Sequence, residues 1–208
     1  MDNPSQSNTI AFFDLDGTLT RKDSFVEFIK FHAGFVKFIY GLIVLSPTLF
    51  AYAIGIIPNF SAKEKVFTFF FKGMTEEDLI TKGEEFCLQV MPKILNSETV
   101  SRLEYHQSQK HTTVVVTASL QHYVKPWCDK NNVAVIATIP DVQNNIITGR
   151  LSSKNCYGPE KVNRIREHFD LSEYKQIHAY GDSRGDYDML ELAHHPYYKG
   201  KPWNVKQT

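Results

Sequence analysis

The chain has 208 residues, of which 42% are hydrophobic and 22% are charged. This length accommodates one well-buried domain, or a core domain with a modest insertion. Its 23 basic residues are balanced by 23 acidic ones, so the charge does not favour nucleic acid as a partner. Three cysteines, Cys87, Cys128 and Cys156, show neither metal-ligand spacing nor a disulfide framework. This is typical of a reducing compartment, and we expect a cytoplasmic protein.

The first predicted element is a strand at residues 9–13, a short apolar run that ends at Asp14. From residue 23 to about residue 107 the pattern predicts helices throughout. Ser24 is a candidate N-cap for the first of these helices, and Thr75 for a later one.

An apolar segment within this helical block contains no charged residue from Phe38 to Ala62. About 20 apolar residues would span a bilayer, but Pro47 near the middle would break or kink one helix. We therefore predict two short buried helices that meet at Ser46 and Pro47. The alternative is an interfacial hairpin that contacts a membrane surface through residues 38–57.

Strands alternate with helices in the second half of the chain. The predicted strands are residues 112–116, 133–137 and 176–180, a hairpin is predicted near residues 146–151, and a helix begins near Pro159. This alternation predicts a parallel sheet in a doubly wound, Rossmann-like α/β fold.

The helical block between the first two strands is too long for a simple crossover. We therefore predict a core made of residues 1–22 and 108–208, with residues 23–107 inserted as an all-helical cap.

Acidic residues follow two of the predicted strands. Asp14 and Asp16 come after the first strand, and Asp182 and Asp186 come after the last. Functional groups of such sheets gather at the carboxyl ends of the strands, where these carboxylates would repel one another. A hard divalent cation with oxygen ligands, such as Mg²⁺, would relieve this repulsion.

Two further residues could bind a phosphate beside these carboxylates. Thr117 ends a strand and offers a hydroxyl, and Lys161 offers a positive charge. A phosphate that approaches an anionic Asp14 needs such neutralisation.

Four segments in this order resemble the motifs of the haloacid-dehalogenase superfamily. They are FFDLDGTLT, VVVTAS, Lys161 within GPEKVNRI, and YGDSRGDYDML. The resemblance implies the fold already predicted, and the activity of a Mg²⁺-dependent phosphatase. It covers nearly the whole chain.

The resemblance also implies roles for the acidic residues. Asp14 would be the nucleophile that forms an aspartyl-phosphate, and Asp16 the general acid and base. Mg²⁺ would be held by Asp14, the main-chain carbonyl of Asp16, and Asp182. Asp186 would lie close by or bind through water.

The remaining implied roles concern phosphate and substrate. Thr117 and the amide of Gly17 would hold phosphoryl oxygens, while Lys161 would balance their charge. Asp23 stands near the position of the acidic cap residue that meets the substrate ammonium in phosphoserine phosphatases. Residues 24–101 contain no arginine to bind a substrate carboxylate, and Lys63 or Lys65 would lack its bidentate geometry.

The sequence alone therefore does not identify the substrate. We predict a small phosphorylated metabolite. The apolar cap is also similar to a subgroup that includes phosphatidylglycerophosphate phosphatases, which would imply a lipid phosphate at the membrane surface. The same motifs would also suit a phosphotransferase or mutase, or a non-enzymatic phospho-acceptor domain. The sequence does not indicate the oligomeric state.

Overall fold

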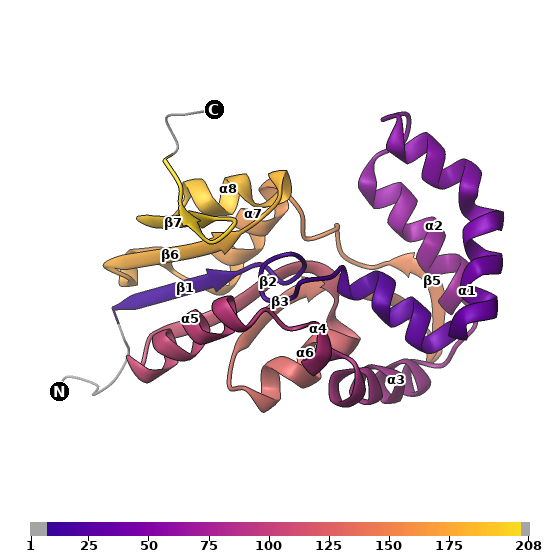
Figure 1. Cartoon of the computed structure of the whole chain (residues 1–208), viewed down its shortest axis with the longest axis horizontal. Helices are drawn as coiled ribbons and strands as arrows, with labels where there is room; N and C mark the ends of the chain where they lie inside the picture. Colours follow the sequence, from indigo (N-terminus) through magenta and orange to yellow (C-terminus); the bar gives the residue numbers. More distant parts are fainter. Residues whose placement is uncertain (1–7, 205–208) are drawn as a thin grey trace.

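The protein is described by a computed structural model that covers residues 8–204. Its main sheet has six strands in the order β3-β2-β1-β6-β7-β8 (Figure 1). All neighbours run parallel except β7 and β8, so the predicted doubly wound α/β fold is confirmed. The strands are β1 (Thr9–Phe13), β2 (Thr112–Leu120), β3 (Ala134–Thr138), β6 (Gln176–Gly181), β7 (His195–Tyr198) and β8 (Lys201–Pro202).

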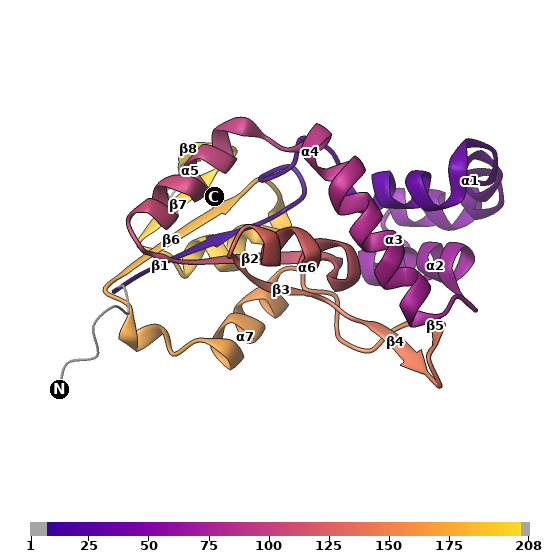
Figure 2. The ribbon, with the colours of Figure 1, turned by 90° about the horizontal axis from the view of Figure 1, so that it is seen from below.

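Alternate residues of β1 face opposite sides of the sheet. Ile10 and Phe12 belong to one buried cluster, whereas Ala11 and Phe13 belong to the other. Helices α5 and α6 cover the Phe13 face, and α7 and α8 cover the Phe12 face (Figure 1, Figure 2). The bounds are α5 (Ser97–Ser108), α6 (Gln121–Lys130), α7 (Pro159–His168) and α8 (Tyr187–Glu191).

Between β1 and β2 the chain is helical, as predicted. The helices before α5 are α1 (Ser24–Ala53), α2 (Asn59–Phe71), α3 (Glu76–Gln89) and α4 (Met91–Ile94). Helices α1 and α2 pack side by side beyond one end of the sheet (Figure 1). The division at residues 22 and 107 stays a prediction; α5, the last helix of the predicted cap, packs against β2.

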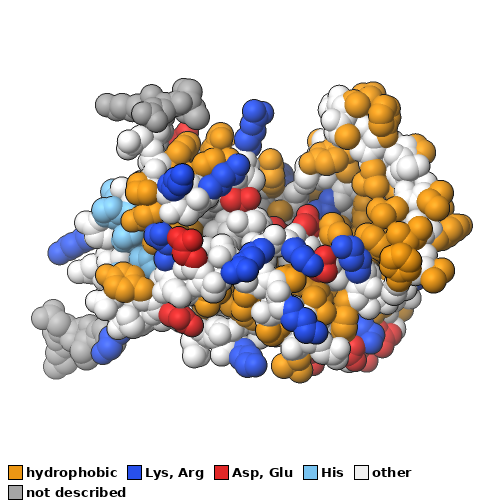
Figure 3. All heavy atoms as spheres, viewed as in Figure 1, with side chains coloured by type: hydrophobic (Ala, Val, Ile, Leu, Met, Phe, Trp, Pro, Cys, Tyr) orange, Lys and Arg blue, Asp and Glu red, His pale blue; other side chains and the backbone are white. Residues whose placement is uncertain are grey.

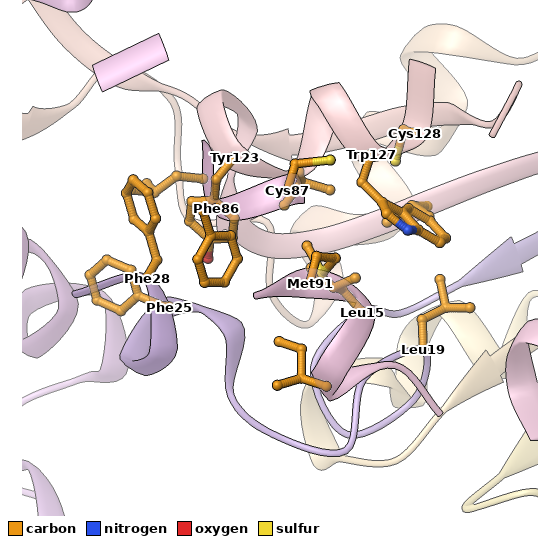
Figure 4. Close-up of a cluster of buried hydrophobic side chains, with 14 of the residues drawn as sticks. Leu15, Leu19, Phe25, Phe28, Phe86, Cys87, Met91, Tyr123, Trp127 and Cys128 are labelled. Carbon is orange, nitrogen blue, oxygen red and sulfur yellow. The ribbon is translucent and has the colours of Figure 1, made fainter. Parts of the chain in front are cut away.

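Aromatic side chains join the cap to the core. Phe28 of α1, Phe86 of α3 and Tyr123 of α6 form one cluster, with ring centroids 4.6–5.5 Å apart (Figure 4). Helix α3 can approach α6 closely because residue 83 is glycine: a Cβ there would lie 2.0 Å from the His122 carbonyl oxygen.

The predicted hairpin is also present, and it contacts the cap. It consists of β4 (Pro140–Gln143) and β5 (Ile146–Leu151), and β5 packs against α2. The amide of Gly73 donates to the Ile147 carbonyl, and the Ile147 amide donates to the Met74 carbonyl. These bonds tie the hairpin to the turn that follows α2.

The prediction for the apolar segment was wrong in two respects. Helix α1 continues through Ser46 and Pro47, and the interruption lies instead at Gly34 (φ 71°), where two helical segments meet at a kink. Pro47 cannot donate to the Ile43 carbonyl, but the Ser46 hydroxyl donates to that oxygen at 2.8 Å, which removes the penalty for an unpaired carbonyl. Nor is the segment buried, since only 11% of its most apolar window is buried.

Candidate active site

The acidic residues meet because β1 and β6 are neighbours. Phe13 pairs with Tyr180, and the Asp14 amide donates to the Tyr180 carbonyl at 2.9 Å. Asp14 and Asp182 therefore leave the sheet side by side at the carboxyl ends of the two strands. Asp186 joins them from the short turn that follows, so that one oxygen from each carboxylate lies within 4.8 Å of the others.

Lys161 bridges two of these carboxylates. It lies in the first turn of α7, is 2% exposed, and donates to Asp14 Oδ1 at 2.5 Å, to Asp186 Oδ1 at 2.6 Å and to the Val116 carbonyl at 2.7 Å. Burial lowers the pKa of Lys161, but the two carboxylates outweigh that effect and raise it overall. The lysine is therefore protonated at neutral pH.

The pKa values of Asp14 and Asp186 shift in opposite directions, although both carboxylates contact Lys161. Burial raises the pKa of Asp14 well above its ordinary value, and the charges of Asp186 and Asp16 add to this against the opposing effect of Lys161. Burial also raises the pKa of Asp186, but Lys161 and hydrogen bonds from Ser183 outweigh it and lower the pKa overall. Asp186 therefore ionises more readily than Asp14, because Lys161 outweighs the effect of burial on Asp186 but not on Asp14.

Asp182 has an unpaired buried oxygen. Its Oδ1 has no hydrogen-bond partner, and burial followed by the charge of Asp186 raises its pKa. By contrast, Asp186 Oδ2 accepts hydrogen bonds from the Asp182 amide and from the amide and hydroxyl of Ser183. An unpaired carboxylate oxygen beside two more carboxylates is what a hard divalent cation would bind.

Asp16 points toward the cap. Its Oδ1 accepts from the Ser24 amide at 2.7 Å and its Oδ2 from the Ser119 hydroxyl at 2.5 Å. The sequence suggested Ser24 only as a helix cap, and it gave no role to Ser119 beside Asp16. Instead, these serines hold the Asp16 carboxylate.

Thr117 is buried and lines the same cavity as Asp14. Its hydroxyl oxygen accepts from the Ser119 amide at 3.0 Å. Since one hydroxyl can accept and donate together, the proton of this group stays available for an acceptor in the cavity.

Asp23, rather than Ser24, caps α1. Its Oδ1 accepts from the Val26 amide at 2.9 Å, so its carboxylate is partly committed to the helix. Burial, and next the charge of Asp16, raise the pKa of Asp23. The residue nevertheless lines the cavity.

Lys63 of α2 reaches this region from the cap. Its ammonium donates to the Ala118 carbonyl and lies 4.9 Å from the centre of the Phe25 ring. Burial lowers the pKa of Lys63, while Asp16 and Asp23 oppose that change. No regular motif in the sequence singles out this lysine; the fold brings it to the acidic residues.

The site opens into a cavity of about 410 Å³ between the core and the cap. Its polar end is formed by the carboxylates, Thr117 and Lys161. Most of its other lining residues are apolar and come from α1 and α2: Ile29, Phe38, Leu42, Leu45, Leu49, Val66 and Phe70. Polar groups of Asp23, Tyr52, Asn59, Lys63 and Tyr157 also line it.

Comparison with known proteins agrees with this geometry. The family described as haloacid dehalogenase-like hydrolase matches residues 11–191. Protein CicA of Caulobacter vibrioides is 32% identical over 195 residues, which is 91% of this chain and 86% of that protein. The chain belongs to the haloacid dehalogenase-like hydrolase family.

Solved structures share the fold. A protein of unknown function from Bordetella pertussis Tohama I has 24% identity and a TM-score of 0.82, and the match covers 92% of this chain and 89% of that one. A phosphoserine phosphatase with a phospho-aspartyl intermediate analogue has 19% identity and a TM-score of 0.58, over 90% of this chain and 84% of that one. The haloacid dehalogenase fold with a cap is therefore confirmed.

Gly17 lies against the Asp182 carboxylate in this hydrolase. Its φ is +83°, and a Cβ would lie 2.1 Å from Asp182 Oδ2. We expect Gly17→Ala to displace the Asp182 carboxylate and to lower hydrolytic activity by about a hundredfold, equivalent to about 2.7 kcal/mol. Steady-state hydrolysis of a chromogenic phosphomonoester would measure this loss.

The matched control for Gly17→Ala is Gly73→Ala. Gly73 has a φ of +88°, but a Cβ there meets nothing within 4 Å. Both variants carry the backbone strain of a left-handed alanine, about 1–2 kcal/mol, whereas only the first carries the clash. Equal losses of activity in the two variants would show that glycine is needed at position 17 only for its backbone conformation, and not to leave room for the Asp182 carboxylate.

Proposed function

We propose that the protein is a Mg²⁺-dependent phosphatase that hydrolyses phosphomonoesters through an aspartyl-phosphate on Asp14. The observation that carries the proposal is the cluster of Asp14, Asp182 and Asp186, whose oxygens lie within 4.8 Å of one another, beside the buried Lys161. The phospho-aspartyl analogue bound in a structurally similar phosphoserine phosphatase supports the same intermediate here.

The donor set fits Mg²⁺. It is composed of carboxylate oxygens, and Asp182 Oδ1 lacks a hydrogen-bond partner. Asp14, Asp182 and the main-chain carbonyl of Asp16 would hold the ion, with Asp186 behind them because its oxygens already accept from Lys161 and Ser183. When bound, Mg²⁺ would neutralise charge on the phosphoryl oxygens.

Asp14 and Asp16 have different roles in the proposed reaction. The Asp14 carboxylate attacks phosphorus, and the bond from phosphorus to the ester oxygen breaks. Asp16 acts as general acid and gives a proton to the departing oxygen. Water then attacks the aspartyl-phosphate and passes a proton to Asp16, which releases phosphate and restores Asp14.

Three groups would bind the phosphoryl oxygens. The Thr117 hydroxyl and the Gly17 amide supply hydrogen bonds, and the Lys161 ammonium supplies positive charge in a site shielded from water, where electrostatic stabilisation is strong. Ser24 and Ser119 would position Asp16 from the cap and from β2.

The residues that line the cavity indicate which kind of substrate fits. From sequence we expected a small polar metabolite, with Asp23 as a contact for an ammonium group. The apolar walls from α1 and α2 instead favour a leaving group with an apolar portion, such as a lipid phosphate. The free, buried cysteines suit a reducing compartment, and we propose a cytoplasmic enzyme.

Metal dependence tests this proposal. Phosphate release should require Mg²⁺, stop in excess chelator, and be inhibited by Ca²⁺, which accepts looser geometry. Asp182→Ala should raise the Mg²⁺ concentration for half-maximal activity at least about tenfold, and more than Asp186→Asn does. Full activity in chelator, or equal Mg²⁺ requirements in both variants, would contradict the assigned ligands.

A panel of phosphomonoesters would separate hydrolysis from transfer. Phosphoserine, sugar phosphates and lipid phosphates should be tested with Mg²⁺, with both free phosphate and phosphorylated products measured. A phosphatase releases one phosphate per substrate consumed, whereas a mutase or phosphotransferase yields a new phosphoester. A phospho-acceptor domain would retain the phosphoryl group without turnover.

A further inference from the structure

The outward side of α1 is apolar. Val36, Tyr40, Ile43, Phe50 and Ile54 recur at three- or four-residue steps, or multiples of them, and are 82%, 60%, 67%, 66% and 54% exposed. Residues at this spacing lie on one side of a helix. The solvent-facing side of a surface helix is normally polar, so this stripe indicates a contact that the isolated chain does not provide.

The apolar surface continues around the turn between α1 and α2. Phe35 is 79% exposed and Ile56 is 71% exposed, at opposite ends of the stripe. Figure 3 shows hydrophobic side chains gathered over this end of the molecule. We call these seven residues the α1 apolar face. Single exposed apolar residues are ordinary, but a continuous patch marks an interaction site.

The opposite side of α1 is also apolar, because it lines the cavity. Leu42, Leu45 and Leu49 face the space that ends at Asp14 and Asp16. A helix that is apolar all round belongs in a large core or in a lipid environment. In the part of the chain that the structure describes, α2 covers only the inner side.

The charges near the α1 apolar face favour an anionic partner. The sequence has no acidic residue between Glu27 and Glu64. Lys37 is exposed beside Val36. Figure 3 shows few charged side chains on the hydrophobic end itself, with Lys, Arg, Asp and Glu side chains along its border. Cations beside an apolar helix face complement anionic lipid headgroups.

We infer that the α1 apolar face lies on the surface of an anionic lipid membrane. A second copy of the chain is the alternative partner for this face, but a two-fold interface would bring the same face of that copy to it, and residues 28–63 contain no acidic residue to complement Lys37. Binding to the membrane needs no turnover, so the inference does not depend on the proposed phosphatase activity.

Flotation with lipid vesicles tests the inference. The full chain is mixed, in excess chelator, with vesicles of phosphatidylcholine alone or with phosphatidylglycerol added. We expect the protein to float with the anionic vesicles and less with the neutral ones. Ile43→Asp should lower the bound fraction at high lipid at least about tenfold, because a charged group enters the apolar region.

Leu88→Asp is the matched control. Leu88 lies on α3 and is 64% exposed, against 67% for Ile43, so that both changes place a carboxylate at an exposed apolar position. Leu88→Asp should bind vesicles like wild type. Neither residue lines the cavity, so hydrolysis of a soluble chromogenic phosphomonoester should be unchanged in both. Circular dichroism checks folding, and Phe50→Asp replaces Ile43→Asp if the latter fails to fold.

Three outcomes would overturn the inference. Wild type could fail to float with anionic vesicles, or the Ile43 and Leu88 variants could float equally. Alternatively, sedimentation velocity could reveal a dimer that Ile43→Asp dissociates while no form binds vesicles, which would make the face a contact between copies. None of these outcomes affects the metal or chromogenic-substrate tests of the proposed function.

Discussion

Asp14→Asn should lower phosphate release by at least about a thousandfold, equivalent to about 4 kcal/mol in the barrier. The change nearly preserves shape but removes the carboxylate that would form the aspartyl-phosphate. Hydrolysis in saturating Mg²⁺ measures the loss. Rapid quenching followed by mass spectrometry should detect a phosphorylated wild-type protein and no phosphorylated variant.

Asp16→Asn is the informative comparison for Asp14→Asn. A nitrophenolate leaving group needs little protonation, so Asp16→Asn should retain more of the first step with that ester than with an alkyl phosphate. Asp14→Asn should be inactive with both. If Asp14→Asn stays within about tenfold of wild type, the covalent mechanism is wrong.

Lys161→Met should destabilise the protein by about 3–5 kcal/mol, because it removes one partner from a buried ion cluster. The lysine side chain is 2% exposed and pairs with both Asp14 and Asp186, so the variant leaves two carboxylates without their buried cation. Denaturant unfolding in chelator measures the free energy of unfolding. Added Mg²⁺ should restore part of the loss by binding the folded state.

Lys125→Met supplies the control for Lys161→Met. Lys125 pairs with Asp129 on the surface of α6, and such exposed pairs contribute about 0–1 kcal/mol. Adding Asp14→Asn to Lys161→Met should recover part of the stability, since one unpaired charge is removed. A loss below about 1 kcal/mol in Lys161→Met would contradict a structural role for the buried cluster.

The end of the sheet that carries the candidate site could be predicted because the residues of this site follow the predicted strands in the sequence. Three of the four predicted strands end beside a candidate site residue, namely Asp14, Thr117 or Asp182, and parallel strands present their carboxyl ends together. Asp14, Asp182 and Asp186 accordingly meet in the structure. Strands β7 and β8 were not predicted: they have four and two residues, too few for an alternating pattern.

The surroundings of Asp16 and the cap could not be predicted in the same way. Ser119 and Lys63 reach Asp16 or its neighbourhood through tertiary packing, which sequence spacing does not encode. For α1, Pro47 predicted a break, but the hydrogen bond from Ser46 to Ile43 preserves the helix. The apolar composition of α1 predicted a buried helix. Composition alone does not distinguish a helix in a protein core from a helix that binds a partner at the surface.

The bend at Gly34 has a mechanical consequence. Before it, α1 is fixed to the core through Phe28, and the Ser24 amide holds Asp16 at 2.7 Å. After it, the helix carries the α1 apolar face. Because a non-helical residue interrupts the helical hydrogen-bond ladder, the two segments need not tilt as one rod. We therefore expect the outer segment, together with α2 against which it packs, to adjust its angle against a curved or fluctuating surface while Asp16 keeps its orientation.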